Sequence, residues 1–171
     1  GGYVVNASSE ESGLAINGMS NHKRDSKVAN SAIIVTISPN DYRNHPLDGI
    51  VFQKKLEEKA YATSNGKIPV QLYKDFKQNK VSKTLNGSNY KFKGDYAFAN
   101  INEIYPKYIT DSIKEAMDNF DKKIKGFADD NVVIAAPESR TSSPIRIERN
   151  ENLEANIKGI YPCGEGAGYA G

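Results

Sequence analysis

The chain has 171 residues, of which 38% are hydrophobic and 26% are charged, with a formal net charge of +2. This length and composition predict one ordinary globular domain with a real core. No apolar run approaches the roughly 18 residues that a membrane span needs, and we find no basic stripe with interleaved aromatic residues of the kind that lines a nucleic-acid groove.

The cysteine and histidine content excludes two further classes of protein. Cys163 is the single cysteine, which excludes an internal disulfide framework and favours a reducing compartment. No basic-then-apolar leader of a secreted protein is seen, so a cytoplasmic location is expected. His22 and His45 lie far apart and far from Cys163. That is not a metal-ligand spacing, and no metal site is predicted.

The first part of the chain predicts a hairpin, a loop and a strand. Two short β-type runs, Tyr3–Val5 and Leu14–Ile16, flank a polar turn and predict the hairpin. Residues 17–27 are polar and predict an exposed loop. The run Ala32–Ile37 is continuous in β-branched residues, which predicts a strand buried on both faces.

Helical signals dominate the middle of the chain. Pro46 suits the first position of a helix that runs to about Thr63, and a shorter helix is expected over residues 70–78. The strongest helical periodicity follows, because five apolar residues fall three or four positions apart and form one stripe. They are Ile109, Ile113, Met117, Phe120 and Ile124.

Short strands are predicted towards the end, over residues 132–136, 144–149 and 157–161. A hairpin, then helices, then strands is an order typical of α+β proteins, not of a regular βαβ series. We therefore predict an α+β fold with a mixed or antiparallel sheet and a few packed helices.

A glycine motif closes the chain. Gly166, Gly168 and Gly171 satisfy the G-x-G-x-x-G spacing after an apolar run. Glycines permit tight turns and let backbone approach a ligand closely, and a following helix directs free N–H groups at negative charge. The same glycines also suit simple packing of a helix on a strand, so the pattern alone is weak.

Two placements of this motif are open. It could begin a Rossmann unit, or it could be the late flavin-contacting motif of a two-domain flavoprotein. Glu165 directly follows Gly164 after the apolar run, which favours the second placement. A carboxylate there can accept a hydrogen bond from a ribityl hydroxyl, and N–H groups of the turn can stabilise negative charge on the reduced ring.

Six blocks of the chain resemble the C-terminal region of a bacterial family described as FAD-dependent proteins or NAD(FAD)-utilising dehydrogenases. The blocks are residues 1–10 (GGYVVNASSE), 17–20 (NGMS), 29–35 (ANSAIIV), 120–127 (FDKKIKGF), 138–147 (ESRTSSPIRI) and 161–171 (YPCGEGAGYAG). The resemblance is loose over residues 64–100. The last block ends at Gly171, where a helix is expected to begin, so we expect a segment excised from a larger protein.

The resemblance implies a division of labour within that larger protein. The primary FAD-binding fingerprint belongs to the absent amino-terminal part. Residues 1–155 are expected to form an inserted substrate-side domain, and residues 156–171 a truncated final strand and glycine turn. By resemblance, the turn contacts FAD through Gly164, Glu165, Gly166, Ala167 and Gly168. The segment alone is expected to be inactive and to lack bound FAD.

Two further groups are candidate substrate-side residues. Arg140, Thr141, Ser142 and Ser143 combine one fixed cation with three hydroxyls, which suits an anionic substrate or the FAD pyrophosphate. A turn whose hydroxyls cap the backbone is the alternative. Asn17, Met19, Ser20 and Arg24 form a polar stretch that could wall the flavin or simply be a solvated connection. Cys163 is either a reactive thiol or a small apolar filler.

The predicted function is therefore a share of a FAD-dependent oxidoreductase. Its partners would be the missing FAD-binding half, an unidentified and anionic small substrate, and a nicotinamide nucleotide. A non-catalytic flavin sensor or partner-docking domain is the alternative, and a nucleic-acid-modifying flavoenzyme is a weaker one. No membrane contact is expected.

Overall fold

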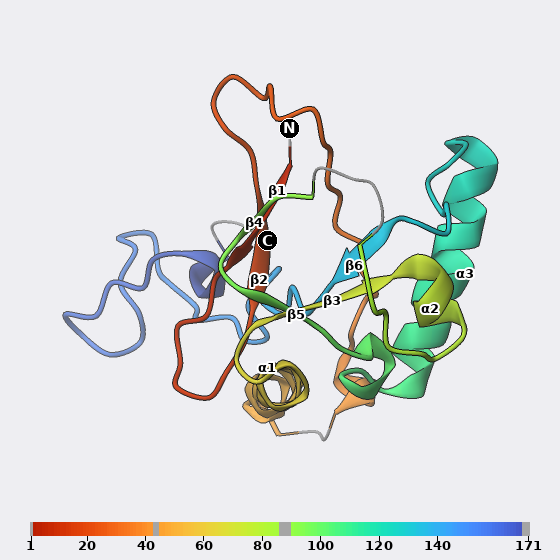
Figure 1. Ribbon diagram of the computed structural model, residues 1–171. Coiled ribbons are helices and arrows are strands. Elements are labelled where there is room, and N and C mark those ends of the chain that lie inside the picture. The colour runs from red at the N-terminus through yellow and green to blue at the C-terminus, as the bar shows by residue number, and fades with distance from the viewer. Residues whose placement is uncertain (1, 43–44, 86–89, 169–171) are drawn as a thin grey trace. The chain divides into compact units, whose positions relative to one another are not determined.

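The computed structural model describes residues 2–42, 45–85 and 90–168. Contacts divide the chain into two compact units (Figure 1). The sheet unit comprises Gly1–Thr36 and Leu56–Ser139, and the turn unit comprises Ile37–Lys55 and Arg140–Gly171. This grouping concerns contacts within the present chain. The boundary predicted after residue 155 stays a prediction.

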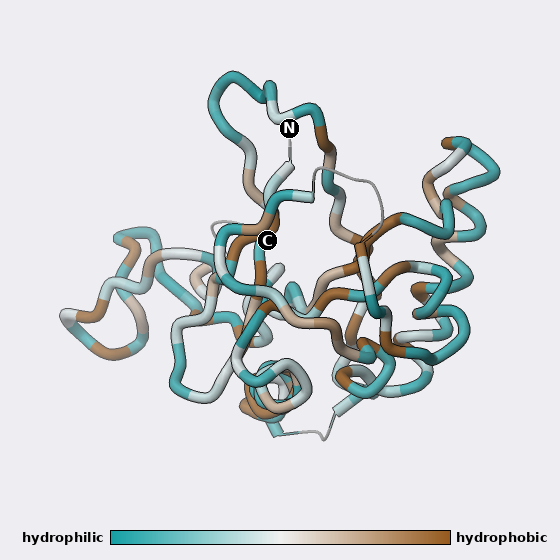
Figure 2. The backbone as a smooth tube through the Cα atoms, in the orientation of Figure 1, coloured by the Kyte–Doolittle hydropathy of each residue, from teal (hydrophilic) through white to brown (hydrophobic). Residues whose placement is uncertain are grey.

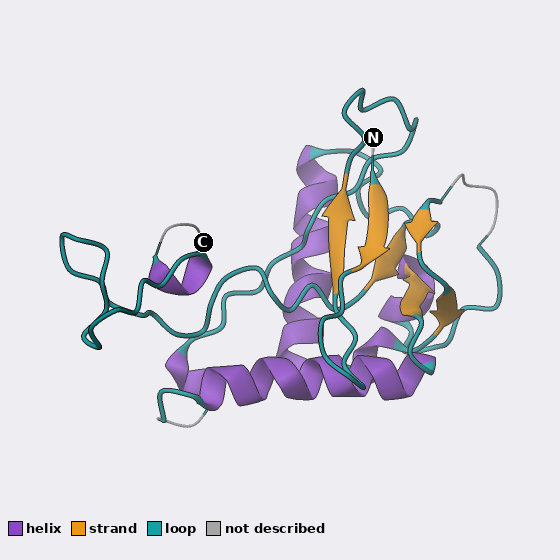
Figure 3. Ribbon diagram, turned by 90° about the vertical axis from the view of Figure 1, so that its left-hand side faces the viewer, coloured by secondary structure: helices purple, strands orange, loops and turns teal. Residues whose placement is uncertain are grey.

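The sheet unit holds all the strands of the described residues and three of their six helices, and Figure 3 colours helices and strands separately. Its elements are β1 (Tyr3–Asn6), β2 (Ile16–Met19), β3 (Ile68–Leu72), α2 (Tyr73–Lys77), β4 (Phe92–Lys93), β5 (Tyr96–Phe98), η2 (Ile101–Glu103), α3 (Lys107–Lys123) and β6 (Val133–Ala135). The turn unit has the single-turn helices η1 (Pro39–Asp41) and η3 (Glu165–Ala167), and α1 (Asp48–Ser64) runs through both units.

The strands form two mixed three-stranded sheets. In the first, with order β2-β1-β4, β1 is antiparallel to β2 and parallel to β4. In the second, with order β5-β3-β6, β3 is parallel to β5 and antiparallel to β6. The α+β prediction with a mixed sheet is confirmed.

The core is built around β3, whose residues are all buried. This central strand continues directly into α2, which buries Tyr73 and Phe76. Both side chains are fully enclosed, and burying a side chain of this size contributes on the order of 2–3 kcal/mol. Figure 2 shows brown, hydrophobic positions along β3. The helix α3 adds Ile109, Ile113 and Met117 to this core.

A polar network inside the sheet unit fixes the loop after α2. Gln71 is fully buried, and its amide nitrogen donates to the Lys80 carbonyl at 2.6 Å while its amide oxygen accepts from the Ile101 N–H at 2.9 Å. Ser82 accepts from the Leu72 N–H at 2.8 Å. Because every buried polar atom here has a partner, the network adds specificity without an unsatisfied group.

Several predicted elements are confirmed with shifted ends. The hairpin exists, but its second strand starts at Ile16 and extends to Met19. The helix predicted from Pro46 starts at Asp48, because the His45 ring nitrogen accepts from the Leu47 N–H at 3.2 Å and holds the preceding turn. The α3 stripe is buried only in its first part, since Phe120 is 40% and Ile124 60% exposed.

Four predictions of secondary structure are wrong. Residues 32–37 form no strand, and Ile34 is 64% exposed. Residues 70–78 are not one helix, because the first three belong to β3 and only Tyr73–Lys77 is helical. Residues 144–149 and 157–161 form no strand either. Each of these short apolar runs fits more than one structure, and periodicity alone cannot distinguish a strand from a buried helix or an irregular segment.

Residues 136–139 connect distant parts of the sheet unit. The Pro137 carbonyl accepts from the Ile16 N–H at 2.9 Å, and the Ser139 hydroxyl donates to the buried Glu57 carboxylate at 2.6 Å. Glu138 lies between Pro137 and Ser139 in the sequence, and desolvation raises the pKa of its carboxyl. Burial, and to a lesser extent the charge of Glu138, raises the pKa of the Tyr105 phenol.

Glu138→Gln should change how stability depends on pH. Because folding raises this carboxyl's pKa from 4.5, the wild-type free energy of unfolding falls as pH rises from there through the folded pKa. Glutamine removes that loss, so the variant should gain stability relative to wild type as the pH rises above 4.5. Urea unfolding across this range measures the difference. Glu115→Gln, at an exposed position on α3, is the matched control, and parallel wild-type and E138Q curves would contradict the assignment.

No helix among the described residues is both long enough and apolar enough to span a membrane.

Candidate functional site

The glycine turn of the turn unit is a tight 3-10 turn with an exposed face. Gly164 precedes η3 and Gly168 follows it, with the Ala167 N–H donating to the Gly164 carbonyl at 3.1 Å and the Gly168 N–H to the Glu165 carbonyl at 2.8 Å. Ala167 is buried and anchors the turn. The Glu165 side chain is exposed, and it makes no hydrogen bond or ion pair with another described residue.

The three glycines of this turn are glycine for different reasons. Gly164 (φ 91°) and Gly168 (φ 72°) adopt backbone conformations that residues with a side chain rarely take. Gly166 has no such conformation, and an added Cβ would meet its nearest neighbour, the Ser143 hydroxyl, at 3.4 Å, which is ordinary contact. The fold therefore does not require glycine at 166, whereas close approach of a ligand would.

Two groups predicted separately come together in the turn unit. The Gly166 carbonyl accepts from the Ile147 N–H at 2.6 Å, so the stretch after Ser143 lies directly against the glycine turn. The Arg146 guanidinium carbon lies 3.4 Å from where a Cβ on Gly168 would be. A fixed cation thus lies beside the turn, and arginine suits phosphate or carboxylate groups. Arg146 was not among the candidate residues predicted from the sequence.

The predicted cluster of residues 140–143 is mostly exposed but not uniform. Arg140, Thr141 and Ser142 are exposed, and the Ser142 carbonyl accepts from the Gln53 side-chain amide at 3.4 Å. The Ser143 hydroxyl instead donates to the Ile145 carbonyl at 2.7 Å. This bond fits the turn-capping alternative for Ser143, and a substrate role stays a prediction for all four residues.

An exposed face of the first sheet holds the second predicted group. Asn17 and Met19 on β2 pair with Val5 and Tyr3 on β1, so they share one face of the sheet. Lys93 pairs with Val5 and lies on this face too. The Lys91 and Lys93 ammonium groups lie 5.5 and 5.1 Å from the centroid of the Tyr3 ring. We call Tyr3, Asn17, Met19, Lys91 and Lys93 the Tyr3 face.

The Tyr3 face gives the predicted polar wall a positive charge. Met19 is 43% exposed, and the Lys93 ammonium lies 3.6 Å from its sulfur. Lys91 and Lys93 were not predicted as site residues, although they alternate with Tyr90 and Phe92 in the sequence. Such alternation predicts a strand with cations on one side.

Three candidate residues remain, Ser20, Arg24 and Cys163. Ser20 and Arg24 are exposed in the segment after β2, where Arg24 has a positive φ of 51°. Cys163 is exposed next to the glycine turn, so the apolar-filler alternative does not describe it. Among the residues that the structure describes, no group of three or more His, Cys, Asp or Glu side chains could hold a metal ion.

Comparison with known proteins identifies the family. Residues 1–141 match the family described as FAD-dependent protein, C-terminal domain-like. The chain belongs to this family. An uncharacterised protein of Clostridium beijerinckii (strain ATCC 51743 / NCIMB 8052) is 46% identical over 175 residues, which include 100% of this chain and 33% of that protein. The chain thus spans about a third of the length of the curated relative it matches.

The predicted resemblance to the C-terminal region of FAD-dependent proteins is confirmed by this match. The matched region ends at residue 141, close to the end of the sheet unit at Ser139. The Tyr3 face lies inside it, and the glycine turn lies outside it. The flavin contacts predicted for residues 164–168 therefore stay a prediction.

Proposed function

We propose that this chain is the substrate-side part of a FAD-dependent oxidoreductase that uses a nicotinamide nucleotide as electron donor. Membership of the FAD-dependent family carries the proposal. When bound, the flavin would supply the redox chemistry, and the protein would position the substrate and tune the cofactor. A cytoplasmic location stays an expectation from the sequence.

In this proposal, the glycine turn contacts the flavin nucleotide. The N–H groups of Glu165 and Gly166 bond to no other described residue, and an added Cβ at Gly164 would have nothing within 4 Å. Backbone donors without side-chain bulk can therefore contact a ligand here. The Glu165 carboxylate would accept from a hydroxyl of the cofactor, and Arg146 would balance negative charge beside the turn.

The Tyr3 face supports an anionic substrate class. Two ammonium groups on one aromatic ring create a positive surface, and Asn17 adds an amide that can donate and accept. In the proposal, this face binds the substrate's carboxylate or phosphate while the flavin provides the reaction centre. The flavin contacts are proposed for the turn unit, and the substrate contacts for the sheet unit.

The turn unit also exposes apolar surface that suits a covering partner. Its large exposed apolar side chains include Leu153, Ile157, Ile160 and Tyr161, of which Tyr161 is 62% exposed. Burying such a patch is favourable at about 25 cal/mol per Å² of apolar area. We propose that the FAD-binding half of the same polypeptide covers it, which agrees with the longer relative.

The test is flavin binding by the intact polypeptide that contains this segment. We expect the purified intact protein to show flavin absorbance bands, to release FAD on denaturation, and to bleach rapidly with reduced nicotinamide nucleotide. The 171-residue segment alone should be colourless. An intact protein that stays colourless after incubation with excess FAD would contradict the proposal, whereas binding without bleaching would contradict only the nicotinamide part.

A further inference from the structure

A shallow open pocket of about 420 Å³ lies in the sheet unit, and no residue of the Tyr3 face lines it. Its size falls in the range of about 300–1,000 Å³ that small-molecule sites occupy. The residues that line it are Lys67, Tyr90, Phe92, Gly94, Asp95 and Tyr96. Neither family membership nor the proposed flavin turn gives these residues a role.

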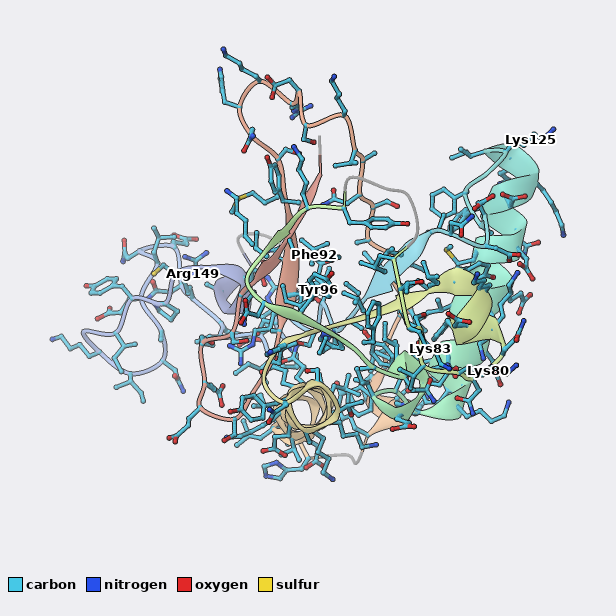
Figure 4. All side chains as sticks on the ribbon, viewed as in Figure 1. Lys80, Lys83, Phe92, Tyr96, Lys125 and Arg149 are labelled. Carbon is cyan, nitrogen blue, oxygen red and sulfur yellow. The ribbon has the colours of Figure 1, made fainter. Side chains whose placement is uncertain are left out.

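One wall of the pocket is aromatic. The Phe92 and Tyr96 rings are 4.9 Å apart between centroids, and Phe98 meets Tyr96 edge-on at 6.0 Å. Figure 4 shows Phe92 and Tyr96 next to each other on β4 and β5. Tyr96 is 44% exposed, so part of its ring is available to a ligand. Aromatic rings prefer a flat partner in an offset-stacked or edge-to-face arrangement.

The polar groups of the pocket are one cation and one anion. Lys67 and Asp95 immediately precede β3 and β5, which pair from Ile68 and Tyr96 onwards. The Ile68 N–H donates to the Asp95 carbonyl at 2.8 Å, which keeps the two residues side by side. Among the described residues, neither the Lys67 ammonium nor the Asp95 carboxylate has a hydrogen-bond or ion-pair partner.

The turn that carries Asp95 is fixed by Gly94. Gly94 has a φ of 123°, which glycine adopts readily. A Cβ added to Gly94 would lie 3.3 Å from the Asn6 Cβ. Tyr90 is also held, because its hydroxyl donates to the Asn131 carbonyl at 2.6 Å. The aromatic wall and the carboxylate are therefore positioned by contacts with the rest of the sheet unit and do not depend on a ligand.

We propose that this pocket binds a small zwitterion that carries an aromatic ring, of the aromatic α-amino acid class. The Lys67 ammonium would bind the ligand's carboxylate, the Asp95 carboxylate its ammonium, and Tyr96 its ring. The two protein charges sum to zero, which suits a ligand of net charge zero. A nucleotide phosphate suits the pocket less, because Asp95 would repel it. This inference does not depend on flavin binding.

The test uses calorimetry and saturation-transfer NMR on the intact protein with L-tryptophan as the probe. An affinity in the range of about 1 mM is expected, because the pocket is shallow and open. Removing one ligand charge, in tryptamine or in indole-3-propionate, should weaken binding at least about fivefold. Cyclohexylalanine, which keeps both charges but lacks the aromatic ring, should also bind more weakly.

Matched variants locate the site. Lys67→Gln and Asp95→Asn should each weaken L-tryptophan binding at least about fivefold, and Tyr96→Leu should weaken it by a similar factor. Tyr108→Leu is the aromatic control, since Tyr108 is 42% exposed on α3, and Lys123→Gln is the charge control at an exposed position on the same helix. Both controls should bind like wild type.

Three results would overturn the proposal. The first is no binding of L-tryptophan, L-tyrosine or L-phenylalanine up to about 10 mM, a concentration well above the expected affinity. The second is binding that K67Q and D95N leave unchanged. The third is tighter binding of AMP than of L-tryptophan, abolished by Y96L, which would assign the pocket to a nucleotide.

Discussion

Gly166→Val should lower the flavin affinity of the intact protein at least about tenfold, which corresponds to about 1.4 kcal/mol. The proposed reason is local: the valine branches would occupy the space through which the turn's backbone approaches the cofactor. The free energy of unfolding of the protein without cofactor should change little in Gly166→Ala, because its Cβ would meet Ser143 and Ile147 at ordinary contact distances. Flavin content and urea unfolding of both variants measure the two effects.

Gly126→Ala is the matched control for loss of a glycine. It lies in the loop after α3 with a φ of 88°, and an added Cβ has nothing within 4 Å. We expect a backbone cost of about 1 kcal/mol and unchanged flavin content. If the intact protein binds FAD and Gly166→Val keeps full occupancy, the turn is not the flavin contact, and the family assignment is unaffected.

Phe76→Ala should remove about 3–5 kcal/mol from the free energy of unfolding of the sheet unit. The Phe76 ring is fully buried, lies 6.4 Å from the Tyr73 ring, and has the Lys114 ammonium 5.0 Å from its centroid. Truncation would leave a cavity between α2 and α3. Because small domains are stable by about 5–15 kcal/mol, the loss should appear as a large shift of the urea midpoint.

Phe120→Ala provides the same chemical change at an exposed position. Phe120 is 40% exposed, and its contact with the Phe127 ring, 5.3 Å between centroids, lies at the end of α3. We expect a loss below about 1.5 kcal/mol. Equal losses in the two variants would mean that α2 is not part of the cooperative core.

The elements that the sequence predicts well have signals that involve only near neighbours. The α3 stripe repeats over several turns, and the hairpin has a polar turn between two β-type runs, so both are found with small errors at their ends. Residues 32–37 fail because β-branched composition shows only that a segment would suit a sheet. A strand also needs a partner with free backbone groups, and this run has none among the described residues.

The candidate site was predictable in part for a similar reason. The glycines at 164 and 168 could be identified from the sequence because a positive φ restricts the residue type directly. Lys91 and Lys93 could not be assigned to the Tyr3 ring, because that contact depends on a pairing between β1 and β4 that no local pattern specifies. Likewise, the place of Arg146 beside Gly168 depends on how the turn unit folds.

The parallel pairing of β1 with β4 joins positions nearly ninety residues apart, Val4 and Phe92. At a synthesis rate of about 5–20 residues per second, roughly 4–18 seconds pass between synthesis of the first strand and synthesis of its parallel neighbour. Until then the amino-terminal hairpin has only two strands, which is marginally stable in water. The first sheet is therefore completed late, and we expect the ribosome-bound chain to need chaperone protection of that open edge until residue 93 has emerged.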